Sequence, residues 1–127
     1  DSRRTYPWGN EDQELIDFHR DMIRIHKDNS ALMRGSYRFL VGEHKLVAYG
    51  RFDEMNKVVV VMNNNYEDVE IKFSVAEIGI PDHTVLTQLM LTTEDGYFLD
   101  PIAYRVTNGK LYVRMPKVSA MVLRANL

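Results

Sequence analysis

Hydrophobic residues recur at helical spacing in the first quarter of the chain. They fall every three or four positions at Leu15, Phe18, Met22 and Ile25, and Ile16 and Ile23 widen the same apolar face. Asn10 is a good N-cap because its side-chain oxygen can accept a bond from a first-turn N–H, and Gln13 completes a capping box. The pattern predicts a helix over residues 11–27.

A second, short helical turn is predicted at residues 30–34. Gly35 follows it, and a glycine at this place commonly ends a helix in the left-handed conformation. We therefore expect Gly35 to close the helical part of the chain.

After Gly35 the pattern changes to short strands separated by turn residues. The expected strands are residues 37–41, 46–52, 58–62, 69–73, 85–91, 97–98, 104–107, 110–113 and 119–123. The continuous apolar run at 58–62 predicts a central strand buried on both faces, whereas the alternation at 69–73 predicts a half-buried strand. Asn108-Gly109 predicts a tight hairpin between 104–107 and 110–113, because both residues tolerate positive φ.

These elements predict a mainly β fold: an antiparallel Greek-key β-sandwich of about eight strands, preceded by one long N-terminal α-helix. The apolar face of the helix must be buried against something. The sandwich can cover it, and so can a larger body that this chain does not contain.

Composition narrows the classes of partner. The formal net charge is −2 and no basic stripe is apparent, so we expect no nucleic-acid partner. No apolar run approaches the roughly 20 residues of a membrane span, so we expect no membrane partner. The chain has no cysteine, which is compatible with a reducing compartment and favours a cytoplasmic location slightly over secretion.

The sequence offers no catalytic, metal or cofactor site. The histidines are His19, His26, His44 and His83. His19 and His26 lie about 10 Å apart along the predicted helix, too far to chelate one ion. The paired acids Asp53–Glu54, Glu67–Asp68 and Glu94–Asp95 fall in predicted turns, where solvated charges are the expected role.

The aromatic residues of the first two predicted strands have two interpretations. They are Tyr37, Phe39, Tyr49 and Phe52. Core residues and cross-strand pairs are the favoured interpretation, and a platform on which sugars stack is the alternative.

The order of several segments resembles the C-terminal end of α-amylase-family glycoside hydrolases, especially neopullulanases, cyclomaltodextrinases and maltogenic amylases. The segments are Asp1-Ser2-Arg3-Arg4-Thr5-Tyr6-Pro7-Trp8, the predicted helix, Ser30-Ala31-Leu32-Met33-Arg34-Gly35, Val47-Ala48-Tyr49-Gly50-Arg51, 58–64 and 116–123. The first looks like the latter part of a late loop of the family's catalytic (β/α)8 barrel, with its proline displaced. The resemblance implies that residues 1–35 are the end of the barrel and that 36–127 are the β-sandwich called domain C.

The same resemblance implies a function. The family hydrolyses α-1,4- and often α-1,6-glucosidic bonds with retention, using carboxylates on earlier barrel strands. No catalytic residue is therefore expected in this chain, and Arg3 alone matches a family position that contacts substrate. We expect an inactive piece that stabilises the barrel, meets α-glucan only through the rest of the enzyme and self-associates through its exposed helix face. The alternative is a free-standing carbohydrate-binding or interaction module.

Overall fold

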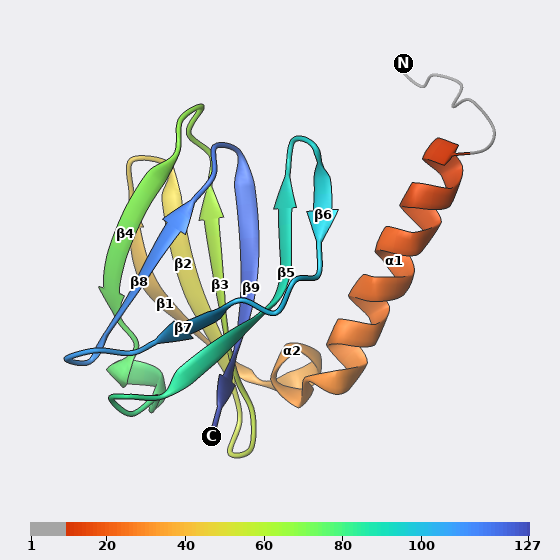
Figure 1. Ribbon diagram of the computed structural model, residues 1–127. Coiled ribbons are helices and arrows are strands. Elements are labelled where there is room, and N and C mark those ends of the chain that lie inside the picture. The colour runs from red at the N-terminus through yellow and green to blue at the C-terminus, as the bar shows by residue number, and fades with distance from the viewer. Residues whose placement is uncertain (1–9) are drawn as a thin grey trace.

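The computed structural model describes residues 10–127, with side chains from residue 13 onward. A long helix, α1 (Asn10–Asp28), leads into the short helix α2 (Ser30–Arg34), and strands follow to the end of the chain. Figure 1 shows α1 standing beside the sandwich, joined to it at one end through α2. The predicted helix ends therefore agree with the structure to within one residue, although the proposed capping side chain of Asn10 lies outside the described residues.

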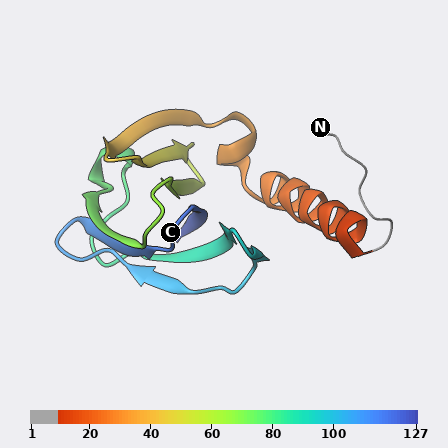
Figure 2. The ribbon, with the colours of Figure 1, turned by 90° about the horizontal axis from the view of Figure 1, so that it is seen from above.

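Most of the strands form one antiparallel sheet, sheet A, with the order β1-β2-β3-β9-β5-β6, and β7 also pairs with β5. Their bounds are β1 Ser36–Glu43, β2 Leu46–Phe52, β3 Lys57–Asn63, β5 Val85–Thr93, β6 Gly96–Phe98, β7 Ala103–Arg105 and β9 Ser119–Asn126. Sheet B contains β4 (Val69–Ser74) and β8 (Lys110–Met115). Viewed from above, the strands enclose a common interior, and α1 lies outside it (Figure 2).

The core lies between the two sheets. From β3 it receives Val59 and Val61, which are fully buried, and from β8 it receives Leu111 and Val113. Val58 and Val60 point to the other face of sheet A, where they pack with Ala31 of α2 in a second cluster. The prediction of a strand buried on both faces at residues 58–62 is confirmed, and the reason is that α2 covers the outer face.

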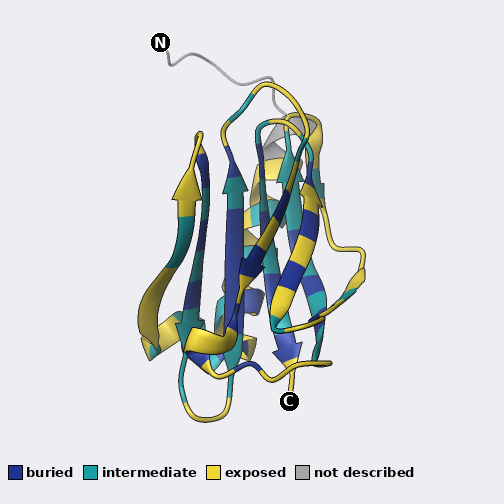
Figure 3. Ribbon diagram, turned by 90° about the vertical axis from the view of Figure 1, so that its left-hand side faces the viewer, coloured by how far each residue is buried: buried dark blue, intermediate teal, exposed yellow. Residues whose placement is uncertain are grey.

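Sheet B is amphipathic. The residues of β4 and β8 alternate between buried and exposed, and Figure 3 shows this alternation as bands along the strands. The half-buried strand predicted at 69–73 is thus confirmed, with its apolar side toward sheet A.

The predicted fold class is confirmed, and two local predictions are corrected. Asn108 and Gly109 adopt positive φ in a tight turn as expected, but only Thr107 and Lys110 pair across it. Beyond that bridge, β7 pairs with β5 and β8 pairs with β4. The chain therefore passes from one sheet to the other at this turn, and 104–107 and 110–113 do not form an extended hairpin.

Gly35 is the second correction. Its φ of −76° and ψ of 167° are extended, so it does not end α2 in the left-handed conformation. A Cβ here would lie 2.6 Å from the carbonyl oxygen of Ala31 and 2.8 Å from that of Phe52. The residue is therefore constrained by the close approach of two backbone segments.

Polar side chains fix α2 to the turn between β2 and β3. Asp53 accepts bonds from the backbone N–H groups of Met55 and Asn56 and from the hydroxyl of Ser30. The side chain of Asn56 accepts from the N–H of Ala31 and donates to the buried Asn29. This network makes the base of α1 a defined point on the sandwich.

Candidate functional site

The apolar face of α1 is only partly covered by the sandwich. Ile25, next to the α2 junction, is buried, and Phe18 and Met22 are half-buried. Leu15, predicted to share this buried face, is 45% exposed. Large apolar side chains of both helices also remain open to solvent, namely Ile16, Ile23 and Met33. The sandwich therefore covers this face of α1 fully at Ile25, partly at Met22 and Phe18, and least at Leu15.

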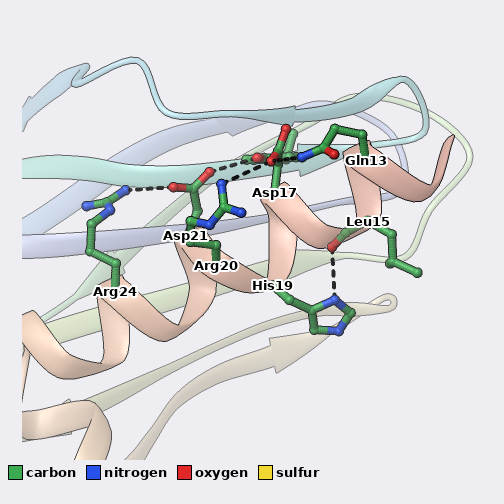
Figure 4. A network of polar contacts seen from close by, with 8 residues as sticks. Gln13, Leu15, Asp17, His19, Arg20, Asp21 and Arg24 are labelled. Carbon is green, nitrogen blue, oxygen red and sulfur yellow. Dashed lines mark hydrogen bonds and ion pairs between the residues drawn. The ribbon is translucent and has the colours of Figure 1, made fainter. Parts of the chain in front are cut away.

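Tyr97 connects the middle of α1 to sheet A through a hydrogen bond and a ring contact. The hydroxyl of Tyr97 on β6 donates to Asp21 at 2.7 Å, and the Tyr97 ring meets that of Phe18 edge to face at 5.2 Å. The hydrogen bond to Asp21, together with desolvation, raises the pKa of Tyr97 to about 12. Figure 4 shows Asp21 within a row of polar contacts along the helix that also includes Arg24, Asp17, Arg20 and Gln13.

Between α1 and the outer face of sheet A lies an apolar groove of about 380 Å³, here called the helix groove. It is lined by Phe18, Met22, Ile25, His26, Leu32, Tyr49, Arg51, Val60, Met90, Thr92, Ala120 and Val122. A second hollow of about 370 Å³ lies on the helices themselves, among Ile23, Met33 and their neighbours. The two hollows adjoin each other on α1, because Met22 and His26 line both of them.

The aromatic residues of β1 and β2 are less buried than predicted. Tyr37 is 60% exposed and Phe39 is 52% exposed, so neither is a core residue. The cross-strand part of the prediction is correct, because Phe39 lies opposite Tyr49 and the Tyr37 and Tyr49 rings are 5.0 Å apart. Phe52 alone packs against the main core.

The histidines and turn carboxylates have local structural contacts. The Nδ1 atoms of His19 and His26 hydrogen-bond the carbonyl oxygens four residues earlier, at 3.0 and 2.9 Å. His44 lies in a turn with positive φ, and His83 is 3.6 Å from Asp82. Within residues 13–127 no group of three or more His, Asp or Glu side chains is placed to hold a metal ion.

The acidic pairs lie in turns, as predicted. The hydroxyl of Ser30 and the backbone N–H of Met55 lower the pKa of Asp53. Asp68 pairs with Arg114 at 3.6 Å, and Glu94 pairs with Lys117 at 3.8 Å. Asp53, Asp68 and Glu94 are engaged in these local contacts, and Glu67 lines a separate hollow together with Glu43 and Glu70. Arg3, the one predicted substrate contact, lies outside the described residues.

Comparisons with known proteins identify the relatives of this fold. No protein-family model matches the chain. An amylopullulanase of Thermoanaerobacterium saccharolyticum is 30% identical to it, and one of Thermoanaerobacterium thermosulfurigenes is 27% identical, each over 97% of the chain. A cyclomaltodextrinase of a Bacillus species is 36% identical over 42% of the chain.

Solved structures share the fold. An α-amylase of Geobacillus thermoleovorans, complexed with acarbose, superposes with a TM-score of 0.76 over 100% of the chain at 18% identity. An Anoxybacillus α-amylase superposes with a TM-score of 0.75 over 97% of the chain at 19% identity. The chain is therefore similar, in sequence and in fold, to a C-terminal domain of α-amylase-family enzymes.

The chain corresponds to a small part of each relative. It spans 7% and 10% of the two Thermoanaerobacterium amylopullulanases, and 24% and 26% of the two α-amylase chains. No described helix of the chain has the length and apolarity needed to cross a membrane.

One feature of the chain was not identified from the sequence. Arg51 lies among the apolar walls of the helix groove, and its Nε atom is buried with no hydrogen-bond partner among the described residues. The alternation of β2 could have placed Arg51 on the outer face, since Leu46, Ala48 and Gly50 face inward. Nothing local in the sequence indicates that helices would cover that face.

Proposed function

We propose that this chain is a non-catalytic part of a glycoside hydrolase that acts on α-glucans by cleaving α-1,4- and α-1,6-glucosidic bonds. Residues 36–127 are its β-sandwich domain C, and residues 1–35 are the end of its catalytic barrel. The observation that carries the proposal is the similarity to amylopullulanases over 97% of the chain, combined with the small share of those proteins that it spans.

The chemistry of the described residues supports a non-catalytic role. A retaining glycosidase needs two carboxyl groups about 5–5.5 Å apart on either side of a bound sugar. Three of the turn carboxylates, those of Asp53, Asp68 and Glu94, are instead engaged by backbone N–H groups, a hydroxyl or a cation. The catalytic carboxylates therefore belong to a part of the enzyme outside this chain, and Arg3 is its proposed contact with substrate.

The exposed apolar surface supports a structural role. Leu, Ile and Met side chains of α1 and α2 are open to solvent around two hollows. Contiguous apolar patches of this kind mark interaction sites. We propose that this surface packs against the catalytic barrel and shields it from water.

The test is the product of the complete open reading frame that encodes the chain. It is expected to contain a barrel sequence before residue 1 and to release maltooligosaccharides from pullulan or cyclodextrin. A complete product that contains this chain and cleaves no α-glucan would overturn the proposal.

A second candidate is a carbohydrate-binding module, which the exposed Tyr37 and Phe39 beside Tyr49 favour. Titrating the 127-residue chain with maltoheptaose while following the fluorescence of Trp8, its only tryptophan, separates the two candidates. A saturable change that Tyr37→Ala abolishes would establish the module. No change favours the structural role.

A further inference from the structure

Arg51 occupies an unusual position for a charged side chain. It projects from β2 into the helix groove beside Tyr49, Val60 and Thr92. Its Nη2 atom donates to the carbonyl oxygen of Gly35 at 3.3 Å, but its buried Nε–H donates to no described residue. The ion pairs of the described residues all involve other cations.

An arrangement of this kind costs stability in the chain by itself. A buried donor without an acceptor loses its hydrogen bonds to water and gains none from the protein. Guanidinium groups are normally matched by a carboxylate or by carbonyl oxygens, because their donors form a rigid planar fork.

We infer that Arg51 anchors a polypeptide segment of the remainder of the enzyme, which inserts apolar side chains into the helix groove and presents a carboxylate to the guanidinium. This inference rests on the proposed function, since it names the contact by which the barrel holds the sandwich. Charge complementarity is the reason for expecting a carboxylate. The Nε–H of Arg51 is buried in the groove without an acceptor among the described residues, and a carboxylate is the strongest acceptor for a guanidinium donor.

The walls of the groove favour a polypeptide over a sugar. Phe18, Ile25, Val60 and Val122 offer no hydrogen bonds from their side chains to the hydroxyl groups of a glucan. The apolar surface also continues past the groove onto Ile23 and Met33, in the second hollow. One extended surface of this kind suits a packed protein interface with a single charged pair near its centre.

The inference predicts different effects in two contexts. In the 127-residue chain, Arg51→Met removes the unsatisfied Nε–H donor together with the 3.3 Å bond to Gly35, and because these two effects offset each other the urea midpoint is expected to stay nearly the same. In the complete gene product, the same substitution removes the partner of a buried carboxylate, so the midpoint is expected to fall. Arg51→Lys keeps the charge without the fork and is expected to lower the midpoint of the complete product by less.

Arg114→Met is the matched control. Arg114 lies on sheet B, on the opposite side of the sandwich from α1, and forms an exposed ion pair with Asp68. Exposed pairs contribute little, so its replacement is expected to leave both midpoints nearly unchanged.

The urea midpoints of the Arg51→Met variants show whether Arg51 contacts the remainder of the enzyme. A midpoint that falls equally in the short chain and the complete product would overturn it, because Arg51 would then act within the sandwich. Unchanged midpoints in both would overturn it as well. Hydrolysis of pullulan by the same complete product is measured in parallel, so failure of the proposed function is seen independently of the stability contrast.

Discussion

Gly35 joins the helical part of the chain to the sheet through a contact that excludes any side chain. A Cβ would meet the backbone oxygen of Ala31 at 2.6 Å, and backbone cannot rotate away as a flexible side chain can. Gly35→Ala is therefore expected to reduce the free energy of unfolding by about 1–3 kcal/mol. Urea unfolding of the two chains measures the difference.

Gly109→Asn provides the control for that substitution. Gly109 has a φ of 75°, a left-handed value that asparagine tolerates, and open space surrounds its Cβ position. Its replacement is expected to change the free energy of unfolding by less than that of Gly35. A larger loss at Gly109 would show that the close backbone approach is not what limits Gly35.

Asp53 gives the junction a predicted pH dependence. Hydrogen bonds from Ser30 and Met55 lower the pKa of Asp53 below its ordinary value of 3.8, so the contribution of its carboxylate to stability is present above that value. The contribution is lost as the pH falls through the lower, folded-state pKa. Asp53→Asn is expected to destabilise the chain at neutral pH and to have a smaller effect at about pH 3. Equal losses at both pH values would contradict this account.

Residue-level features could be predicted where one residue type decides the conformation. The positive φ of Asn108 and Gly109 follows from their chemistry and was expected. His44 and Lys45 also adopt positive φ in the turn between β1 and β2, and their residue types give no such indication. Strand pairing on both sides imposes that turn, and pairing is not a local property.

Helix α1 is attached to the sandwich at two places that differ in strength. At its base, Asn29 and Asn56 belong to a hydrogen-bonded network with α2. Farther along, Tyr97 supplies one hydrogen bond and one ring contact. We therefore expect α1 to open from its far end while its base stays attached.

Tyr97→Phe tests this description. The substitution removes the hydrogen bond to Asp21 and keeps the ring that meets Phe18. Amide hydrogen exchange is expected to become faster in α1 and to remain unchanged in β3 and β9. Tyr66→Phe, at a position 82% exposed, is the control and is expected to change neither. Equal exchange in α1 of Tyr97→Phe and the parent chain would refute the role of this contact.

Elements were predicted well where their own periodicity is strong, as in α1 and β4. Their partners were predicted less well. The chain between Ala103 and Met115 was expected to fold back on itself, but its two halves pair with β5 and β4. Both arrangements satisfy the same alternating pattern, and the packing of the two sheets selects between them.

In the molecule as a whole, the uncovered face of α1 predicts self-association of the 127-residue chain. Ile16 and Ile23 are 51% and 54% exposed on a face that also carries Leu15. The double substitution Ile16→Lys and Ile23→Lys is expected to reduce the mass found by light scattering to that of a monomer. Tyr66→Lys, at an 82% exposed position between β3 and β4, is expected to leave the mass unchanged. A parent chain that is already monomeric would contradict the prediction.

The apolar pattern of the helix predicts that its face is covered by a partner, but the geometry of the site for that partner depends on tertiary structure. The helix groove combines residues from α1, α2, β2, β3, β5 and β9, and none of these elements by itself indicates a depression. The Nε atom of Arg51 is likewise buried only because α1 and α2 cover the outer face of sheet A.

The most direct test of the central claim is an assay of the purified 127-residue chain with maltodextrin and cyclodextrin, followed by the release of reducing sugar. The account predicts no turnover, because the catalytic carboxylates lie elsewhere in the enzyme. The complete gene product, assayed beside it, is predicted to hydrolyse at least one of the two substrates. Turnover by the 127-residue chain alone would contradict the account.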